Sequence, residues 1–189
     1  MLREMEFDGI QLEASVFLTH INLRSYIISF IRELGILLHG NSTKLITSIY
    51  LQREINKPFL ETELFSLLDP FVDYFILFSY EFGLNYLHAP ILWTMNALNT
   101  IGNETHIDPK KIIVGVPLYG HAFTASGPIS KMGIDSLRFL DTKDPPYVTW
   151  EAEAEEHTVM YRQYKDKEFE VITLVLPTPY VIKFLVIAL

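Results

Sequence analysis

The sequence contains no cysteine, and this absence excludes several kinds of site. Without thiols there is no disulfide bond, no thiolate metal ligand and no cysteine nucleophile. Positive charge is also scarce, since 15 Lys and Arg stand against 23 Asp and Glu and give a formal net charge of −8. A surface that binds nucleic acid needs clustered positive charge. We therefore expect no nucleic-acid partner.

Long apolar segments and metal-ligand spacings are missing as well. The apolar tail, residues 180–189 (YVIKFLVIAL), has about half the roughly 20 residues that a membrane-spanning helix needs. It is interpreted as a core helix cut short, so we expect no membrane span. Residues 1–6 lack the charged and apolar regions of a signal peptide. The six histidines show no metal-site spacing, and we expect neither a metal nor a cofactor.

What the chain does contain is enough apolar sequence for a substantial core, because 49% of its 189 residues are hydrophobic. Four segments are predicted as strands, most of them nearly continuous apolar runs typical of a parallel sheet: 7–15, 44–51, 72–80 and 111–119. Three helices are predicted between them: 22–39, 61–68 and 90–101. This alternation of strand and helix predicts an α/β fold with a parallel sheet in sequential order.

The first predicted strand differs from the others in its pattern. By period two, one face of residues 7–15 (FDGIQLEAS) carries Gln11, Glu13 and Ser15, and the other face is mostly apolar. This alternation fits a barrel strand whose outer face packs on helices and whose inner face presents polar groups at its C-terminal end. An amphipathic edge strand with a solvated face would show the same alternation, so the pattern alone leaves both interpretations open.

The strand–helix alternation ends beyond Phe123. A loop punctuated by Gly and Pro is followed by a predicted helix at 134–140 and a predicted hairpin with strands at 157–164 and 169–176. No low-complexity linker divides the chain. We therefore predict one domain over residues 1–189.

Three segments, taken together, resemble glycoside hydrolase family 18, the chitinases and chitinase-like lectins. Residues 8–15 (DGIQLEAS) resemble the fourth-strand motif D-G-x-D-x-D-x-E. Residues 78–81 (FSYE) and 115–123 (GVPLYGHAF) resemble the sixth- and seventh-strand motifs. The resemblance covers nearly the whole chain and implies part of a (β/α)8 TIM barrel, namely strands four to seven, a following hairpin and the start of a late helix. Strands one to three and eight have no counterpart, so an incomplete domain is expected.

The resemblance also implies which catalytic groups are missing. Family 18 enzymes use the last Glu of the first motif as general acid and the substrate's own N-acetyl oxygen as nucleophile. That position is Ser15, whose hydroxyl cannot protonate a leaving group near neutral pH. The two preceding Asp positions hold Glu13 and Gln11, and Asp8 alone is retained. We expect no catalytic residue among these four.

Sugar binding needs less than catalysis, namely an aromatic face and a few directed hydrogen bonds. By the resemblance, Tyr80, Glu81 and Tyr119 lie at strand ends where the family contacts sugar, and Glu13 keeps a carboxylate nearby. These four are the predicted sugar-binding residues. A core aromatic with a satisfied hydroxyl is an equal alternative for each tyrosine. Two tryptophans are further stacking candidates for which a core position is favoured: Trp93 and Trp150.

Three functions are consistent with this pattern. The favoured one is a chitinase-like protein that binds chitin or N-acetylglucosamine oligosaccharides without hydrolysing them, with a protein receptor as a second class of partner. The alternatives are a weakly active glycosidase that uses Glu13 or Glu81 as a displaced acid, and a partner-binding barrel that has lost its sugar.

Two N-glycosylation sequons occur in predicted helix-to-strand loops. They begin at Asn41 (NST) and Asn103 (NET). Together with the secretory and lysosomal location that the resemblance implies, they predict a secreted or lysosomal full-length protein.

Overall fold

The computed structural model describes residues 7–14, 20–51, 62–82, 89–117, 119–124, 127–132, 147–152, 154–165 and 168–177. The chain forms two compact units, which are described separately. Unit 1 comprises Met1–Ser79 and Asn96–Gly115, and unit 2 comprises Tyr80–Met95 and Val116–Leu189. No helix in the described part of the chain combines the length and the apolar character needed to cross a bilayer.

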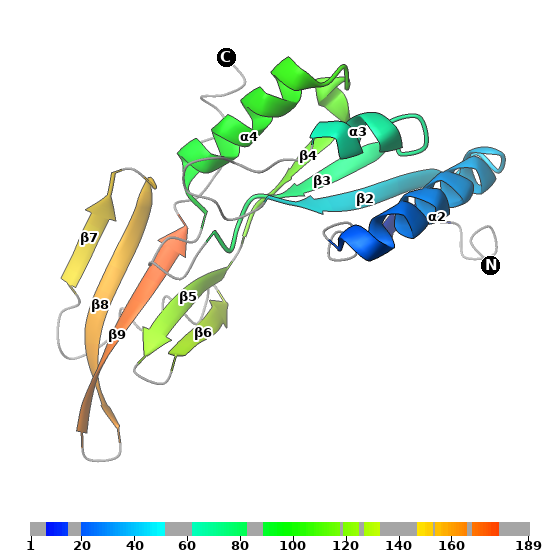
Figure 1. Cartoon of the computed structure of the whole chain (residues 1–189). Helices are drawn as coiled ribbons and strands as arrows, with labels where there is room; N and C mark the ends of the chain where they lie inside the picture. Colours follow the sequence, from blue (N-terminus) through cyan, green and yellow to red (C-terminus); the bar gives the residue numbers. More distant parts are fainter. Residues whose placement is uncertain are drawn as a thin grey trace. The chain divides into compact units, whose positions relative to one another are not determined.

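Unit 1 is built on a parallel four-stranded sheet in sequential order (Figure 1). Its strands are β1 (Gly9–Leu12), β2 (Lys44–Tyr50), β3 (Tyr74–Phe78) and β4 (Ile112–Gly115). All three strand pairs, β1–β2, β2–β3 and β3–β4, are parallel. The predicted four parallel strands in neighbour order are therefore confirmed, although β1 and β4 are shorter than the apolar runs that predicted them.

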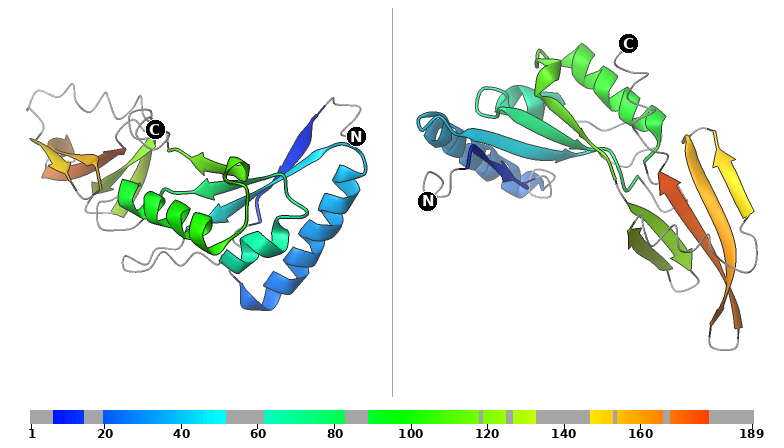
Figure 2. Two further views of the ribbon diagram at one scale, coloured as in Figure 1. Left: turned by 90° about the horizontal axis from the view of Figure 1, so that it is seen from above. Right: turned by 180° about the vertical axis from the view of Figure 1, so that it is seen from behind.

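The helices of unit 1 lie along one face of this sheet (Figure 2). The helical elements of the chain are α2 (Ile21–His39), α3 (Thr62–Leu68), α4 (Ile91–Glu104) and the 3-10 turn η1 (Pro109–Lys111). The core between helices and sheet contains Ile31, Phe65 and Phe75, which are fully buried. The rings of Phe65 and Phe75 lie 5.1 Å apart. The predicted helices correspond to α2, α3 and α4, each within a few residues of its predicted ends.

The opposite face of the sheet is less covered in the described residues. Tyr50 is 37% exposed and Ile113 is 41% exposed, and Phe78 is half-buried. The rings of Tyr50 and Phe78, on adjacent strands, lie 4.8 Å apart at 60°. This aromatic and aliphatic face is the side that a barrel strand turns toward the barrel interior.

One glycine lies within α2 and another directly follows it, and their backbones are constrained in different ways. Gly35 packs so closely on the Phe71 backbone that a β-carbon there would lie 2.4 Å from the Phe71 carbonyl oxygen. Gly40 follows the last helical residue, as predicted, but its φ of −60° is right-handed. The left-handed residue of this turn is Ser42, with φ 57°. The helix therefore ends at the predicted place without using the conformational freedom of the glycine.

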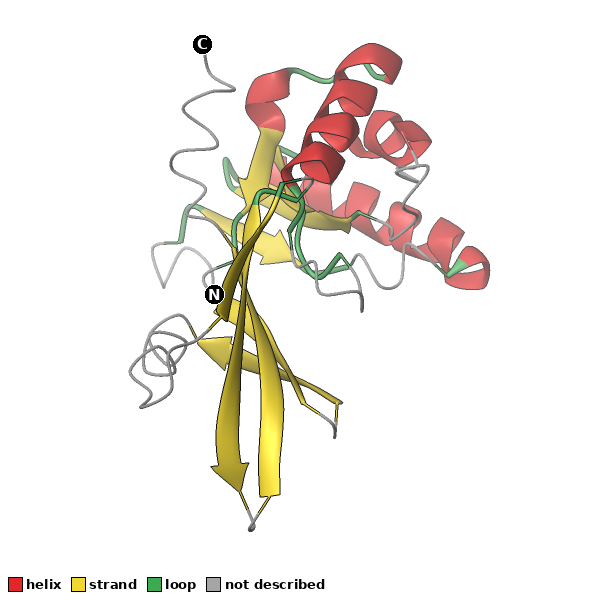
Figure 3. Cartoon of the chain, turned by 90° about the vertical axis from the view of Figure 1, so that its left-hand side faces the viewer, coloured by secondary structure: helices red, strands yellow, loops and turns green. Residues whose placement is uncertain are grey.

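Unit 2 contains a five-stranded antiparallel sheet in the order β6-β5-β9-β8-β7. The strands are β5 (Tyr119–Thr124), β6 (Gly127–Met132), β7 (Tyr147–Glu151), β8 (Glu156–Lys165) and β9 (Glu168–Pro177). Figure 3 shows β8 and β9 as a long twisted pair, so the predicted hairpin is confirmed. The predicted helix at 134–140 and the predicted helical tail at 180–189 lie outside the described residues.

Two predictions about this region are wrong. The fourth parallel strand does not continue to residue 119, because β4 ends at Gly115 and Tyr119 begins β5 of the antiparallel sheet. Pro117 lies between them and has no N–H to donate to a strand ladder, which gives a physical reason for the break. The Gly- and Pro-containing stretch after Phe123 was predicted as a loop, yet it includes β6. Its pairing with β5 depends on register rather than on local propensity.

Candidate functional site

The first group of predicted site residues lies at the carboxyl end of β1 in unit 1. Gln11 is exposed, and its Nε2 atom donates a hydrogen bond of 3.4 Å to the Oγ atom of Ser48 on β2. Glu13 follows the strand and is also exposed, whereas Ala14 is buried. Gln11 and Glu13 therefore lie on the more open side of the strand, as the period-two pattern predicts. Asp8 precedes β1 and is exposed. Ser15 lies outside the described residues.

The second group lies in unit 2, where three predicted residues make contact. The Tyr119 hydroxyl donates a hydrogen bond of 2.6 Å to Oε1 of Glu81. The rings of Tyr80 and Tyr119 lie 6.2 Å apart at 81°, an edge-to-face arrangement. All three side chains are half-buried, so each has a covered part and an open part. Two aromatic rings and a carboxylate therefore form one cluster, made by residues that directly follow β3 and by the first residue of β5.

The backbone at Glu81 is held in the left-handed region, with φ 60°. This conformation costs a residue with a β-carbon roughly 1–2 kcal/mol. Such conformations persist where surrounding contacts determine them, and they are concentrated at ligand-binding and catalytic sites. The hydrogen bond from Tyr119 is one such contact. The strain at Glu81 therefore supports a fixed arrangement of the cluster.

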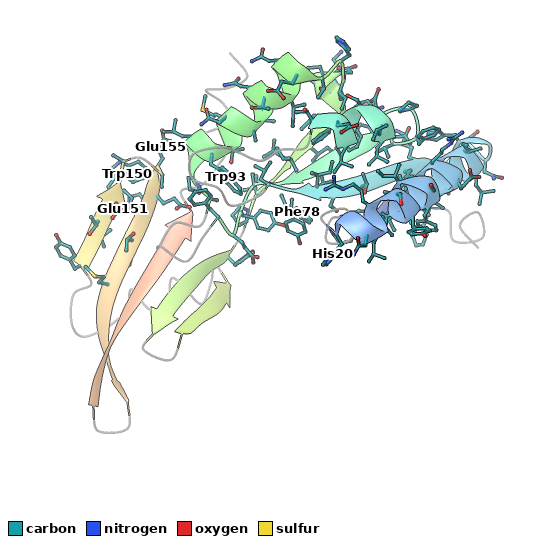
Figure 4. The ribbon with its side chains drawn as sticks, viewed as in Figure 1. His20, Phe78, Trp93, Trp150, Glu151 and Glu155 are labelled. Atoms are coloured by element: carbon teal, nitrogen blue, oxygen red, sulfur yellow. The ribbon has the colours of Figure 1, made fainter. Side chains whose placement is uncertain are left out.

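Two residues that the sequence did not indicate as a pair extend this cluster. The rings of Phe82 and Trp93 lie 4.9 Å apart at 60°, and Trp93 is only 6% exposed. The favoured core position is therefore confirmed for Trp93. For Trp150 it is wrong, because that residue is 46% exposed on β7 and its ring lies 4.7 Å from His157 (Figure 4). The signal that could have indicated Phe82 is its position two residues after Tyr80 in the F-S-Y-E-F run.

A cavity of about 370 Å³ lies elsewhere in unit 1, at the amino ends of β3 and β4. Its lining includes His39, Asp69, Asp73 and Lys111. The strand ends that carry Gln11 and Glu13 are the carboxyl ends, so this cavity is not part of the predicted site. Among the residues that the structure describes, no three His, Asp or Glu side chains are grouped so that they could hold a metal ion.

Beside this cavity, Asp73 connects the segment before β3 with β2 and α2 through hydrogen bonds. Its Oδ2 atom accepts hydrogen bonds from the Leu45 backbone N–H at 2.8 Å and from Nε2 of His39 at 2.9 Å. Burial by itself raises the pKa of Asp73, but the Leu45 hydrogen bond, the hydrogen bond and charge of His39 and the charge of Lys44 outweigh it. The pKa of Asp73 therefore lies below its ordinary value, which favours the charged form that accepts these hydrogen bonds.

The fold is similar to that of several solved glycosidases. A protein described as a sporulation-specific glycosylase, ydhD of Bacillus subtilis, is 16% identical with a TM-score of 0.75 over 96% of this chain and 61% of its own. A chitinase of Chromobacterium violaceum is 19% identical with a TM-score of 0.70 over 93% of this chain and 56% of its own. The Group IV chitinase of Ostrinia furnacalis is 14% identical with a TM-score of 0.69 over 91% of this chain and 56% of its own.

Sequence comparison adds no match to these structural ones. No protein-family profile matches the chain, and no curated protein matches it. The chain spans about 61% of the length of the first of these solved structures and about 56% of the two chitinases. The predicted fold class is confirmed: the chain has a partial (β/α)8 TIM-barrel fold similar to the fold of these solved structures.

Proposed function

We propose that this chain is part of a chitinase-like carbohydrate-binding protein that recognises chitin or N-acetylglucosamine oligosaccharides and does not hydrolyse them. The observation that carries the proposal is the cluster of Tyr80, Glu81 and Tyr119, in which the Tyr119 hydroxyl holds the Glu81 carboxylate and the two half-buried tyrosine rings lie edge to face. An aromatic face with directed polar groups is the combination that a pyranose ring requires. One of the structurally similar chitinases has been crystallised with allosamidin.

The absence of hydrolysis is proposed from the residues at the acid positions. By the resemblance, the position of the motif's proton donor holds Ser15, which is not a carboxylic acid. A missing general acid costs roughly 10²–10⁴-fold in rate. Gln11 and Glu13 also alter the groups that would orient the acetamide, and a misplacement of about 1 Å can cost on the order of 10²-fold. The two losses together support binding without turnover.

The finer proposal concerns the branch of the family. We propose, from likeness in short sequence segments, that the chain belongs with the chitinase domain-containing protein, also called the stabilin-interacting chitinase-like lectin. That branch likewise lacks the catalytic acid and carries Glu at the position of Glu13. The segments 89–93 (APILW), 148–150 (VTW) and 156–157 (EH) add to this likeness. By this likeness we propose a protein receptor as a second partner, beside the oligosaccharide.

Binding is tested by isothermal titration calorimetry of the folded protein with chito-oligosaccharides. Tyr119→Ala removes both the ring and the hydroxyl that fixes Glu81, so we expect the affinity to fall by roughly 1–3 kcal/mol. Tyr26→Ala is the matched control, because Tyr26 is 73% exposed on α2. Equal affinities for wild type and Tyr119→Ala would assign Tyr119 to the core and remove the main support for the proposed site.

We also propose a secreted or lysosomal location for the full-length protein. Asn41 is exposed in the turn after α2, and its Nδ2 atom, which would carry the glycan, donates to the Leu37 carbonyl oxygen at 2.8 Å. The second sequon was predicted in a loop, and this is wrong: Asn103 lies in the last turn of α4, which ends at Glu104. The sequon's Thr105 is buried, and its hydroxyl donates to the Ile101 carbonyl at 2.7 Å.

This proposal predicts different behaviour of the two sequons. In cells that pass the protein through the secretory route, Asn41→Gln should remove an endoglycosidase-sensitive mass shift, and Asn103→Gln should leave most of it. A protein without any glycan in such cells would contradict the proposed location.

A further inference from the structure

A fully buried glutamate lies at the start of β8 in unit 2. Glu156 is 0% exposed, and its Oε1 atom accepts a hydrogen bond of 2.6 Å from the backbone N–H of Ala89. Burying a carboxyl group is costly unless hydrogen bonds compensate for the lost water. This short hydrogen bond joins residues 67 positions apart in the sequence. It therefore holds the segment before α4 firmly against β8.

In a second hydrogen bond beside it, a backbone N–H at the start of α4 again donates to a residue just before or at the start of β8. The Ile91 backbone N–H donates to the Ala154 carbonyl oxygen at 3.2 Å. Pro90 has no N–H, so the backbone donors of residues 89 to 91 are both bound by residues 154 to 156. The first N–H groups of a helix have no partner inside the helix. Ala154, between β7 and β8, and Glu156, the first residue of β8, thus supply acceptors at the start of α4.

This connection is held in a conformation that its sequence does not favour. Glu155, between the two acceptor residues, has a left-handed φ of 54°. Figure 4 shows Glu155 beside the first turn of α4. For a residue with a β-carbon this conformation costs roughly 1–2 kcal/mol, and it persists only where contacts on both sides determine it. The hydrogen bonds of Ala154 and Glu156 are those contacts.

Two aromatic rings connect the first turn of α4 with the cluster of Tyr80, Glu81 and Tyr119. Trp93, two residues after Ile91, packs against Phe82 with ring centroids 4.9 Å apart. Phe82 directly follows Tyr80 and Glu81, which contact Tyr119. Contacts and short stretches of backbone therefore connect Glu156, through the start of α4 and the Trp93–Phe82 pair, to the residues proposed to bind sugar.

We propose that Glu156 is a positioning residue for the saccharide site, acting through Ala89, the first turn of α4 and the Trp93–Phe82 contact on Tyr80 and Glu81. This inference rests on the proposed function. Glu156 is fully buried and does not touch the sugar. Its role is to hold the start of α4, so that the strained backbone at Glu81 keeps its carboxylate within reach of Tyr119.

The experiment compares three variants in the full chain. Glu156→Gln keeps an oxygen that can accept the Ala89 N–H, and Glu156→Leu removes it. Glu151→Leu is the matched control, because Glu151 lies directly opposite Glu156 on β7. The chain has two tryptophans, so Trp150→Phe assigns the indole N–H resonance of Trp93 in a ¹⁵N-labelled sample. That resonance reports the Trp93–Phe82 contact independently of any ligand.

We expect Glu156→Gln and Glu151→Leu to bind chito-oligosaccharides within twofold of wild type and to leave the Trp93 resonance in place. Glu156→Leu should shift the Trp93 resonance and lower the affinity at least tenfold. A folded Glu156→Leu protein with wild-type affinity would overturn the inference. If Glu156→Leu does not fold, Glu156→Asp takes its place, since its side chain is shorter by one methylene. Wild-type affinity in that variant would likewise overturn the inference.

Failure of the proposed function gives a different result. If the wild-type protein binds no oligosaccharide, the proposed function is wrong and the saccharide role of Glu156 is overturned with it. The Trp93 resonance still shows whether Glu156 holds the start of α4 in place. A shift in Glu156→Leu but not in Glu156→Gln supports this positioning role, and no shift in either variant overturns it.

Discussion

Asp73 should make the stability of unit 1 depend on pH in the acid range. Its carboxylate accepts the N–H of Leu45, a fully buried residue, and also bonds to His39. Its pKa lies below the ordinary value because the Leu45 hydrogen bond, His39 and Lys44 together outweigh the effect of burial. A group whose folded-state pKa is lowered adds stability above its unfolded-state pKa, about 3.9 for Asp, and loses it as the pH falls through the folded-state value.

The size of the effect follows from the bonds that are lost. Asp73→Ala leaves the buried Leu45 N–H without its acceptor, at a cost of roughly 1–3 kcal/mol. The partly exposed pair with His39 adds about 0.2–1 kcal/mol. Asp73→Asn keeps an acceptor oxygen and removes only the charge, so its loss should be smaller. We therefore expect a free energy of unfolding lower by about 1–4 kcal/mol in Asp73→Ala near pH 6.5.

The assay is urea unfolding of wild type and both variants between about pH 6.5 and pH 3, with the Leu45 amide resonance followed by NMR. The difference between wild type and Asp73→Asn should shrink as the pH falls below about 4, and the wild-type Leu45 amide shift should titrate with it. Asp69→Asn is the control, because its 2.6 Å pair with Lys111 is partly exposed and worth at most about 1 kcal/mol. A pH-independent difference between wild type and Asp73→Asn would refute the reasoning.

Two further predictions concern packing and activity. Gly35→Ala should lower the free energy of unfolding by roughly 1–3 kcal/mol in chemical denaturation, because the new methyl group would meet the Phe71 carbonyl at 2.4 Å. Gly102→Ala has open space in α4 and should raise it by about 0.5–1 kcal/mol; equal effects of the two changes would show that the close approach at Gly35 is not real. The protein should release no fluorophore from a fluorogenic chitobioside above background, since Ser15 supplies no proton. Turnover that disappears in Glu13→Gln would identify a displaced catalytic acid instead.

A related change tests how the acid positions work together. In a protein that closes the barrel, Ser15→Glu alone should not restore hydrolysis, because the acetamide would still lack its Asp orienter. The triple change Gln11→Asp, Glu13→Asp and Ser15→Glu is the version expected to regain activity in the same chitobioside assay. Equal activity of the single and triple variants would contradict the role given to the orienting residues.

The sequence alone was sufficient to predict the parallel sheet of unit 1 and the order of its strands. Strands such as β2 have nearly continuous apolar runs with a largely buried middle, and such runs can be recognised without knowing their neighbours. Helix α2 is equally local, with apolar residues at helical spacing and a polar turn after residue 39. The hairpin of β8 and β9 is also local, because its strands are joined by a short loop.

Elements that depend on distant pairing could not be predicted in the same way. β6 lies in a stretch with weak strand propensity and is a strand because β5 supplies its register. Tyr119 was assigned to the fourth parallel strand, since the apolar run continues past Pro117, but the missing N–H of that proline ends the ladder and the chain enters another sheet. Local periodicity contains no information about such a change of sheet.

For the candidate site as well, some features follow from the sequence and others only from the structure. The sequence by itself determined which residue types stand at the candidate positions, namely a serine at Ser15 and aromatic residues at Tyr80 and Tyr119. Only the tertiary structure decided that Tyr119 donates to Glu81, 38 positions away, and that the buried carboxyl group of Glu156 holds the start of α4. Hydrogen bonds between distant residues require a particular arrangement of the backbone, and that arrangement is produced by the packing of the whole unit rather than by any segment of the chain.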